Sequence, residues 1–134
     1  EVGDYYRASL WNGTAASWVD LHPSGSTWST ALAAIGSHQV GAATVHGVNR
    51  ASIWSGTAAS WVDLHSFLPS WFTHSYARGI STDGVSIYVT GNGFNSVTDR
   101  YEALLWTQPV PEPGTMAALG LGLAAVVRRR RRIT

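Results

Sequence analysis

The stretch RASLWNGTAASWVDLH at residues 7–22 recurs as RASIWSGTAASWVDLH at residues 50–65, with only two of sixteen positions changed. The offset between the two copies is 43 residues. Weaker matches continue at this offset to Trp28/Trp71, and the offset then widens to 46 at Thr44/Thr90 and to 52 at Trp54/Trp106. The chain therefore contains two repeat units, at about 7–49 and 50–101, and the first strand of a third.

Alternation of apolar and polar residues within a unit predicts half-buried β-strands, as at Val85, Ile87 and Val89, which are separated by polar neighbours. We expect strands near residues 6–11, 16–22, 27–35 and 39–46 of the first unit, although TWSTALAAI at 27–35 also fits a helical turn. Short glycine-containing sequences separate these strands and are able to adopt the positive φ of a tight hairpin. They are Asn12-Gly13, Pro23-Ser24-Gly25, Ser55-Gly56, Asp83-Gly84 and Asn92-Gly93.

A four-stranded unit of about 43 residues with repeated tryptophans resembles a β-propeller blade. The unit is also similar to the short repeats of HAF-type exported bacterial proteins, through Ala8, Leu10, Trp11, Gly13, Asp20 and Leu21 and their counterparts Ala51, Ile53, Trp54, Gly56, Asp63 and Leu64. These resemblances imply an all-β fold of short antiparallel, propeller-like blade repeats. Closed propellers have roughly four to eight blades, so we expect that the other blades are missing, are supplied by another chain or never formed. For the fragment expressed alone we expect aggregation or oligomers.

The C-terminal stretch QPVPEPGTMAALGLGLAAVVRRRRRIT at residues 108–134 has a different composition. Residues 114–127 carry no charge, and an apolar segment of this kind can lie in hydrocarbon only as a helix. Fourteen helical residues span roughly 21 Å, against a bilayer core of about 30 Å, so the arginine stems that follow must extend the segment. We predict a transmembrane segment at 114–127, with a cytoplasmic cluster of Arg128, Arg129, Arg130, Arg131 and Arg132.

The order of Val110, Pro111, Glu112 and Pro113, the apolar segment and the terminal arginines resembles the PEP-CTERM sorting signal of Gram-negative bacteria. In that family an exosortase, a membrane-embedded transpeptidase-like enzyme, is thought to recognise the Pro-Glu-Pro element. Each proline fixes φ and lacks an N–H, which keeps such a peptide extended and accessible. The resemblance implies an exported domain at 1–107 and a sorting signal at 108–134. The alternative is that Pro-Glu-Pro is a linker before a permanent tail anchor.

The charge of the chain is divided unequally between these two parts. Residues 1–110 hold four arginines against seven acidic residues, a net charge of −3, so the basic character belongs to the tail. This composition indicates no nucleic-acid partner. The absence of cysteine excludes disulfides and thiol chemistry. Because the sequence begins at Glu1 and not at a methionine, we expect a fragment or a processed product.

No pattern in the exported domain points to catalysis, a cofactor or a metal. Asp20 and His22 recur as Asp63 and His65, and residues copied in each unit are expected to brace the strands more often than to form a site. The repeated tryptophans at 11, 54 and 106 and at 18 and 61 are expected to pack between blades. The unrepeated Tyr76, Tyr88 and Tyr101 are the candidates for ligand contact, with an extracellular polysaccharide as the candidate ligand.

The sequence therefore predicts an exported bacterial protein that is held in the inner membrane as a precursor with a cytoplasmic C-terminus. After processing it is expected at the cell surface or in the extracellular matrix, as a non-catalytic binding or structural module. Two alternatives remain open. One is a fragment of an exported propeller hydrolase or lyase with its active site in missing blades, and the other is a permanently tail-anchored membrane protein.

Overall fold

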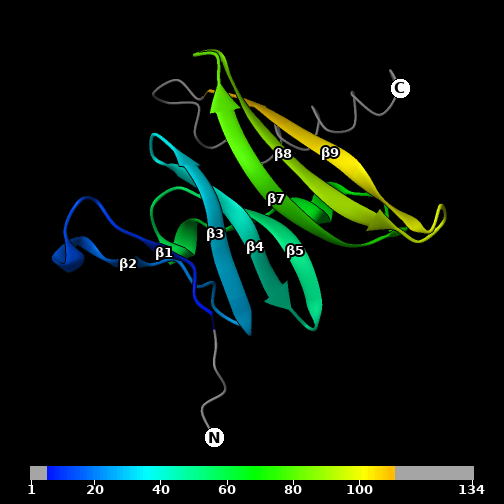
Figure 1. The fold of residues 1–134 in the computed structure, drawn as a ribbon, viewed down its shortest axis with the longest axis horizontal. Helices are drawn as coiled ribbons and strands as arrows, with labels where there is room; N and C mark the ends of the chain where they lie inside the picture. The colour runs from blue at the N-terminus through cyan, green and yellow to red at the C-terminus, as the bar shows by residue number, and fades with distance from the viewer. Residues whose placement is uncertain (1–5, 111–134) are drawn as a thin grey trace, which may run out of the picture.

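The structure is a computed structural model that describes residues 6–110, and within this range it consists of short and long antiparallel strands with three 3₁₀ turns (Figure 1). The first sheet pairs β1 (Ser9–Leu10) with β2 (Val19–Asp20). The second has the order β3 (Trp28–Ile35), β4 (His38–Val45), β5 (Val48–Trp54) and β6 (Val62–Asp63). The third has the order β7 (Phe72–Thr82), β8 (Ser86–Asn95) and β9 (Arg100–Pro109). The all-β prediction is confirmed, and the 27–35 segment is a strand.

The 3₁₀ turns η1 (Ala15–Ser17) and η2 (Ala58–Ser60) occupy the same place in the two near-identical segments, directly before β2 and β6. Both turns are closed by a serine, since Ser17 Oγ and Ser60 Oγ each donate to the carbonyl three residues earlier, at 2.6 Å. A third turn, η3 (Leu64–Phe67), follows β6 and has no counterpart after β2. Near-identical sequence thus gives similar local structure as far as Asp20 and Asp63, and the units diverge from Leu64, where η3 begins.

The sheets are displaced relative to the sequence repeats. The sequence units begin with the strands β1, β5 and β9, whereas the second sheet begins with β3 and the third sheet begins with β7. The second sheet therefore takes its first two strands from one unit and its last two from the next. Neither the second nor the third sheet is completed by a single unit, and this makes folding of neighbouring units interdependent.

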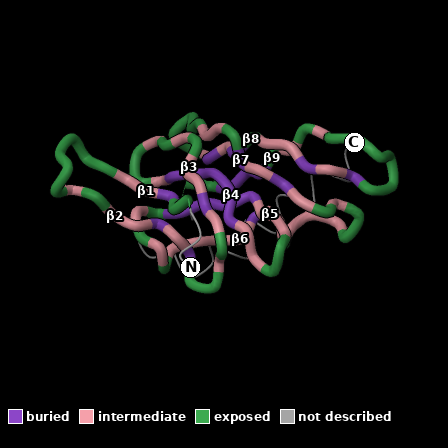
Figure 2. The backbone as a smooth tube through the Cα atoms, turned by 60° about the horizontal axis from the view of Figure 1, so that its bottom comes forward, coloured by how far each residue is buried: buried purple, intermediate pink, exposed green. Residues whose placement is uncertain are grey.

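The main core lies between the second and third sheets, where β7 contacts β3, β4 and β5. It contains Val40, Ala51, Ile53, Leu64, Ala77, Ile87, Val89 and Trp106. A smaller cluster of Ala8, Leu21 and Trp54 joins the first sheet to the second. Figure 2 shows the buried backbone concentrated in the middle of the molecule and the exposed backbone at the hairpin ends. Each sheet is thus held by its neighbour in the row.

The predicted turn at Asn92-Gly93 is wrong. Both residues lie inside β8, where Asn92 pairs with Tyr76 and Gly93 pairs with Ser75. The other four predicted turns do place a glycine at positive φ, between 83° and 88° at Gly13, Gly25, Gly56 and Gly84. In β8 glycine instead allows the backbones of β7 and β8 to approach closely, since a Cβ on Gly91 would lie 2.0 Å from the Tyr76 carbonyl oxygen.

The sheet registers also correct the alignment of the two units after residue 22. Trp28 pairs with Thr44 in the second sheet, and the corresponding pair in the third sheet is His74 and Phe94. Trp28 therefore corresponds to His74, and Trp71 precedes β7. The reason is the longer connection after β6, which contains η3 and delays the next strand.

The three sheets lie in a row and form no closed ring within residues 6–110 (Figure 1). Among these residues no helix has the length and apolar character needed to cross a membrane. The predictions for Pro111, Glu112 and Pro113, for the segment 114–127 and for the arginines at 128–132 lie outside the described residues.

Candidate functional sites: an aromatic sheet face and the end of the last strand

The repeated histidines brace the junction between one strand and the next unit. His22 Nδ1 lies 2.7 Å from Ser29 Oγ, and that hydroxyl accepts the backbone N–H of Ala8 at 2.9 Å. The second unit repeats this arrangement, with His65 Nδ1 2.8 Å from Ser75 Oγ and the Ala51 N–H donating to the same oxygen at 3.1 Å. Burial, and then the nearby Arg50, lower the pKa of His65.

The repeated aspartates, Asp20 and Asp63, form ion pairs with arginines and not with the histidine rings. Asp63 Oδ2 accepts from Arg50 Nη1 at 2.8 Å, and Asp20 pairs in the same way with Arg7. The Arg7 hydrogen bond keeps the pKa of Asp20 below its ordinary value. Asp20 Oδ1 also accepts the backbone N–H of His22 at 2.9 Å. Asp20 therefore fixes the backbone at His22, whereas the buried Asp63 Oδ1 has no hydrogen-bond partner within the described residues.

A serine next to a histidine is the pairing that activates a nucleophile in hydrolases. Here Ser29 and Ser75 are both completely buried, and each hydroxyl accepts a backbone N–H. No substrate can reach an oxygen placed in this way. The two copies of the Ser–His pair are consequently structural.

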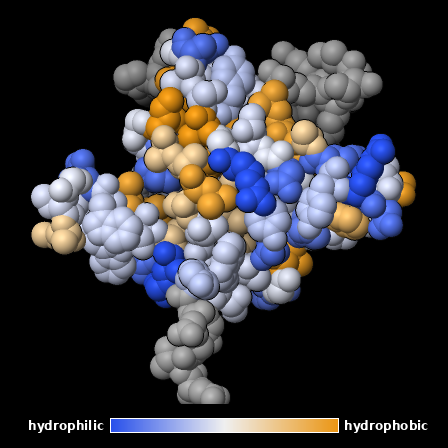
Figure 3. Space-filling model, viewed as in Figure 1, coloured by the Kyte–Doolittle hydropathy of each residue, from blue (hydrophilic) through white to orange (hydrophobic). Residues whose placement is uncertain are grey.

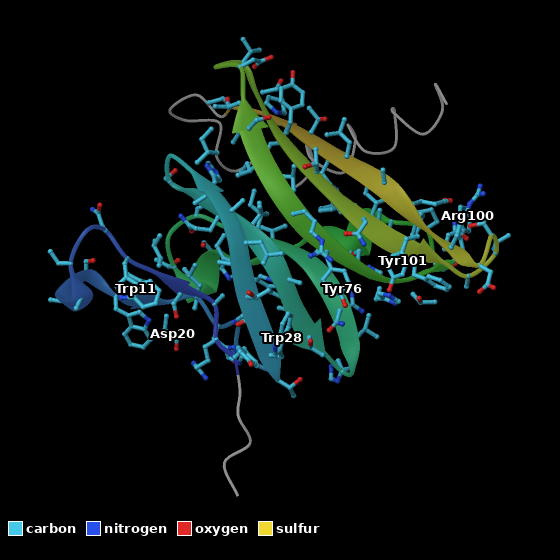
Figure 4. The ribbon with its side chains drawn as sticks, viewed as in Figure 1. Trp11, Asp20, Trp28, Tyr76, Arg100 and Tyr101 are labelled. Carbon is cyan, nitrogen blue, oxygen red and sulfur yellow. The ribbon has the colours of Figure 1, made fainter. Side chains whose placement is uncertain are left out.

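The repeated tryptophans have unequal environments although their sequence positions match. Trp54 and Trp106 are fully buried between neighbouring sheets, as expected. Trp106 Nε1 donates to the Leu64 carbonyl at 3.1 Å. The expectation fails for Trp11 and Trp18, which are 57% and 50% exposed. Within the described chain no sheet covers the side of β1 and β2 that carries Trp11 (Figure 4).

The third sheet has an outer face, defined as the side turned away from the second sheet. Its strand register places Thr90 opposite Leu105 and Asn92 opposite Ala103. The matching positions of the second sheet are occupied by apolar pairs, Val40 opposite Ile53 and Ala42 opposite Ala51. Those four residues are at most 6% exposed, whereas Leu105 on the outer face is 38% exposed. Polar residues thus replace apolar ones where no further sheet packs, which is the pattern of a terminal repeat.

One end of the outer face carries an aromatic cluster, defined as His74, Tyr76, Phe94 and Tyr101. The rings of His74 and Phe94 are stacked with centroids 5.7 Å apart, and Tyr101 meets both of them edge-on, at 5.5 Å and 5.2 Å. His74 Nε2 and the Tyr101 hydroxyl are 2.9 Å apart. Tyr101 is 56% exposed, so the cluster is open to solvent. Figure 4 shows Tyr76 and Tyr101 on the third sheet, near the β8–β9 hairpin end.

Polar groups border this cluster. The Arg78 guanidinium lies over the Tyr76 ring, 5.0 Å from its centroid, and Arg78 Nε donates to Asn92 Oδ1 at 2.9 Å. Asn49 of β5 donates from Nδ2 to the Tyr76 hydroxyl at 2.6 Å. Exposed rings with adjacent amides and a guanidinium suit a ligand that has both apolar faces and hydroxyl groups.

The structure brings together two of the three tyrosines singled out from the sequence. Tyr88 lies toward the other end of β8, where its hydroxyl donates to Asp83 Oδ2 at 2.8 Å. Sequence reasoning missed His74 and Phe94. The available signal was their alternation with Tyr76 and Asn92, which places all four on one face once β7 and β8 are paired.

No group of three or more potential metal-ligating side chains occurs in the described range 6–110. A shallow groove of about 440 Å³ lies between the first and second units and is lined by His22, Pro23, Ser24, Ala58, Ala59 and Trp61. His22 is engaged with Ser29 there. The groove therefore offers no free titratable pair for acid–base chemistry.

The end of β9 leads directly into the sorting segment. Pro109 pairs with Ser86, and the N–H of Val110 donates to the Val85 carbonyl at 2.8 Å. The last described residues are therefore fixed to the β7–β8 hairpin, and Pro111 begins one residue later. A proline there cannot continue the ladder by donating a hydrogen bond.

Comparison with known proteins bears on this segment alone. Residues 109–132 match the family model described as the PEP-CTERM protein-sorting motif. The chain matches no curated protein and no solved structure, so the comparisons give no support to the resemblance to HAF-type repeats and propellers. By its sorting motif, the chain is similar to exported proteins that pass through a membrane-anchored precursor and are processed by an exosortase-type enzyme.

Proposed function

We propose that this protein is exported, is held in the inner membrane by residues 114–127 with Arg128–Arg132 in the cytoplasm, and is released by cleavage near Pro111–Glu112–Pro113. The observation that carries the proposal is the match of residues 109–132 to the sorting motif, directly after the last strand. The last described residue is Val110, whose N–H donates to the Val85 carbonyl. A processing enzyme therefore meets a folded domain on one side of the motif and an apolar segment on the other.

The test is co-expression of the N-terminally tagged full chain with an exosortase-type enzyme, followed by immunoblotting of membrane and soluble fractions. The wild-type body should appear at lower mass without its arginines. The P111A/P113A variant should stay at precursor mass in the membrane. P109A is the matched control, because Pro109 is part of β9 and lies outside the Pro-Glu-Pro element. Equal processing of P111A/P113A and wild type would refute recognition of the element, and intact wild-type protein in the membrane would indicate a permanent anchor.

Topology is tested separately with an alkaline phosphatase reporter, which is active only outside the cytosol, fused at the N-terminus. The wild-type fusion should be active. Replacing all five arginines at 128–132 by alanine should lower that activity, because clustered arginines retain their flank in the cytoplasm. An inactive wild-type fusion would show that the body is cytosolic.

For the body we propose a non-catalytic contact function in which the aromatic cluster binds sugar rings of an extracellular polysaccharide. Support comes from the exposed Tyr101 ring, its stacked neighbours and the polar border of Asn92 and Arg78. An aromatic contact contributes about 0.5–1.5 kcal/mol, or roughly a 2- to 12-fold change in affinity. In a polysaccharide pull-down, Y101A should weaken binding by this factor and Y88A should not. Equal binding by Y101A and wild type would refute the assignment.

A further inference from the structure

The β7–β8 hairpin end is joined to the last described residues of the chain, Pro109 and Val110. Ser86 pairs with Pro109, and the Val85 carbonyl accepts the N–H of Val110 at 2.8 Å. The hairpin residues 82–86 and the end of β9 therefore move as one piece. Figure 1 shows the hairpin and the end of β9 at the same end of the third sheet.

Chain length then limits the distance of this end from the apolar segment. Three residues separate Val110 from Gly114, and the four Cα–Cα steps between them reach at most about 14 Å when fully extended. The ten residues of β8 extend about 30 Å away from the hairpin, toward the β8–β9 end. If residues 114–127 enter the bilayer, the β7–β8 end must lie at its surface, and the β8–β9 end can lie far from it.

The side chains at the β7–β8 end suit a membrane surface. Val85 is 72% exposed and Val110 is 39% exposed, and Figure 3 shows apolar surface at the tip of this hairpin, at the top of the view. The neighbouring Tyr88 has an apolar ring and a polar hydroxyl, the composition that favours the headgroup region.

Asp83 is the one charged residue among hairpin residues 82–86, and its carboxylate already accepts hydrogen bonds from within the hairpin. Asp83 Oδ1 accepts the N–H groups of Val85 and Ser86 at 2.9 and 2.7 Å, and Oδ2 accepts the Tyr88 hydroxyl at 2.8 Å. Its carboxylate therefore depends less on water than a free surface aspartate does. The β8–β9 end is different, because there Asp99 and Arg100 stand beside the exposed Val97.

We propose that Val85, Val110 and Tyr88 form a membrane-contact surface that seats the folded body of the precursor on the lipid headgroups, with Val85 at the boundary of the acyl chains. This proposal rests on the membrane insertion of residues 114–127 proposed above. The contact orients the tethered body, so that the outer face of the third sheet is perpendicular to the plane of the bilayer. The occupant is the lipid surface, because the three residues between Val110 and Gly114 leave no room for an intervening protein domain.

The chain has no cysteine, so single cysteines can be introduced and labelled without background. The full chain is reconstituted into phosphatidylethanolamine/phosphatidylglycerol vesicles with the environment-sensitive fluorophore NBD at V85C, at V97C or at A124C. Val85 and Val97 are matched, at 72% and 76% exposed, on opposite ends of the third sheet. NBD at V85C should shift to shorter wavelength on reconstitution and be quenched by lipids spin-labelled near the headgroup, whereas NBD at V97C should do neither.

NBD at A124C reports on insertion of residues 114–127 alone, and it therefore distinguishes the membrane tether from the membrane-contact surface. A blue shift at A124C without one at V85C would overturn the membrane-contact surface and leave the tether intact. No shift at A124C would overturn the tether and, with it, the contact surface. Equal shifts at V85C and V97C would show that the body lies flat or aggregates on the vesicle, which also overturns the proposed orientation. A V85T variant with NBD at S86C provides a second measure, in which loss of the apolar side chain should reduce the blue shift.

Discussion

Trp11, Trp54 and Trp106 occupy one repeat position, yet alanine substitutions at these three sites should have very different effects on stability. Trp54 and Trp106 are fully buried, and truncating a buried tryptophan costs about 3–5 kcal/mol through lost apolar burial and the cavity that remains. Trp11 is 57% exposed and lies outside both core clusters. W11A should therefore lower the free energy of unfolding by less than about 1 kcal/mol.

Phenylalanine substitutions separate ring packing from hydrogen bonding at the two buried sites. Trp106 Nε1 donates to the Leu64 carbonyl at 3.1 Å, whereas Trp54 Nε1 has no partner in the described structure. W54F and W106F remove similar ring area, but only W106F removes a hydrogen bond. The W106F loss should exceed the W54F loss by about 1 kcal/mol.

The measurement is urea unfolding of the full chain in a mild detergent, followed by far-ultraviolet circular dichroism so that removal of a fluorophore does not matter. Free energies are compared at a shared m-value. A W11A loss as large as that of W54A would show that another surface covers Trp11. A W54A loss below about 1 kcal/mol would refute the packing of the first sheet against the second.

Three further substitutions or conditions test individual features. G91A should lower the free energy of unfolding by more than about 2 kcal/mol in the same urea assay, because its Cβ would overlap the backbone of β7. A near-wild-type unfolding midpoint for G91A would refute that close approach of the two strands. S75A should cost about 1–3 kcal/mol, since it leaves a buried backbone N–H without its acceptor, and S37A on the exposed hairpin is the control. Burial lowers the pKa of His65, so the unfolded chain binds a proton more readily, and the stabilising contribution present above pH about 6.5 is lost as pH falls through the folded pKa. Unfolding midpoints should therefore decrease between pH about 7 and 5, H65Q should decrease this slope, and an unchanged slope would contradict the assignment.

The glycine turns at Asn12-Gly13 and Ser55-Gly56 and the strands near 27–35 and 39–46 could be predicted from sequence. The strands expected at 6–11 and 16–22 are shorter, at Ser9–Leu10 and Val19–Asp20, and the 3₁₀ turn Ala15–Ser17 before the second of them was not predicted. Alternation and Gly-containing turns are local signals, and they act in the same way in both copies. The error at Asn92-Gly93 has a physical reason. A glycine that is needed for close strand approach is identical in sequence to one that is needed for positive φ.

The differences between tryptophans could not be predicted because burial depends on the neighbouring sheet. Trp11 and Trp54 lie in near-identical segments, but only Trp54 has a sheet beside it in the described chain. Only two of the four residues of the aromatic cluster were predicted, because the pairing of β7 with β8 was not known from the sequence. Tyr76 and Tyr101 stood out as unrepeated, while His74 was hidden by an alignment that matched Trp28 to Trp71.

The displacement of sheets relative to sequence repeats has a consequence for the gene. Recombination between the two near-identical segments removes residues 23–65, and this interval contains all of β3 to β6. The shortened chain would join His22 to Ser66, so that the β7 to β9 sheet follows a copy of the segment it already packs against. Unequal crossover thus adds or deletes one whole sheet at a time, and the length of the row of sheets can change without any strand being cut.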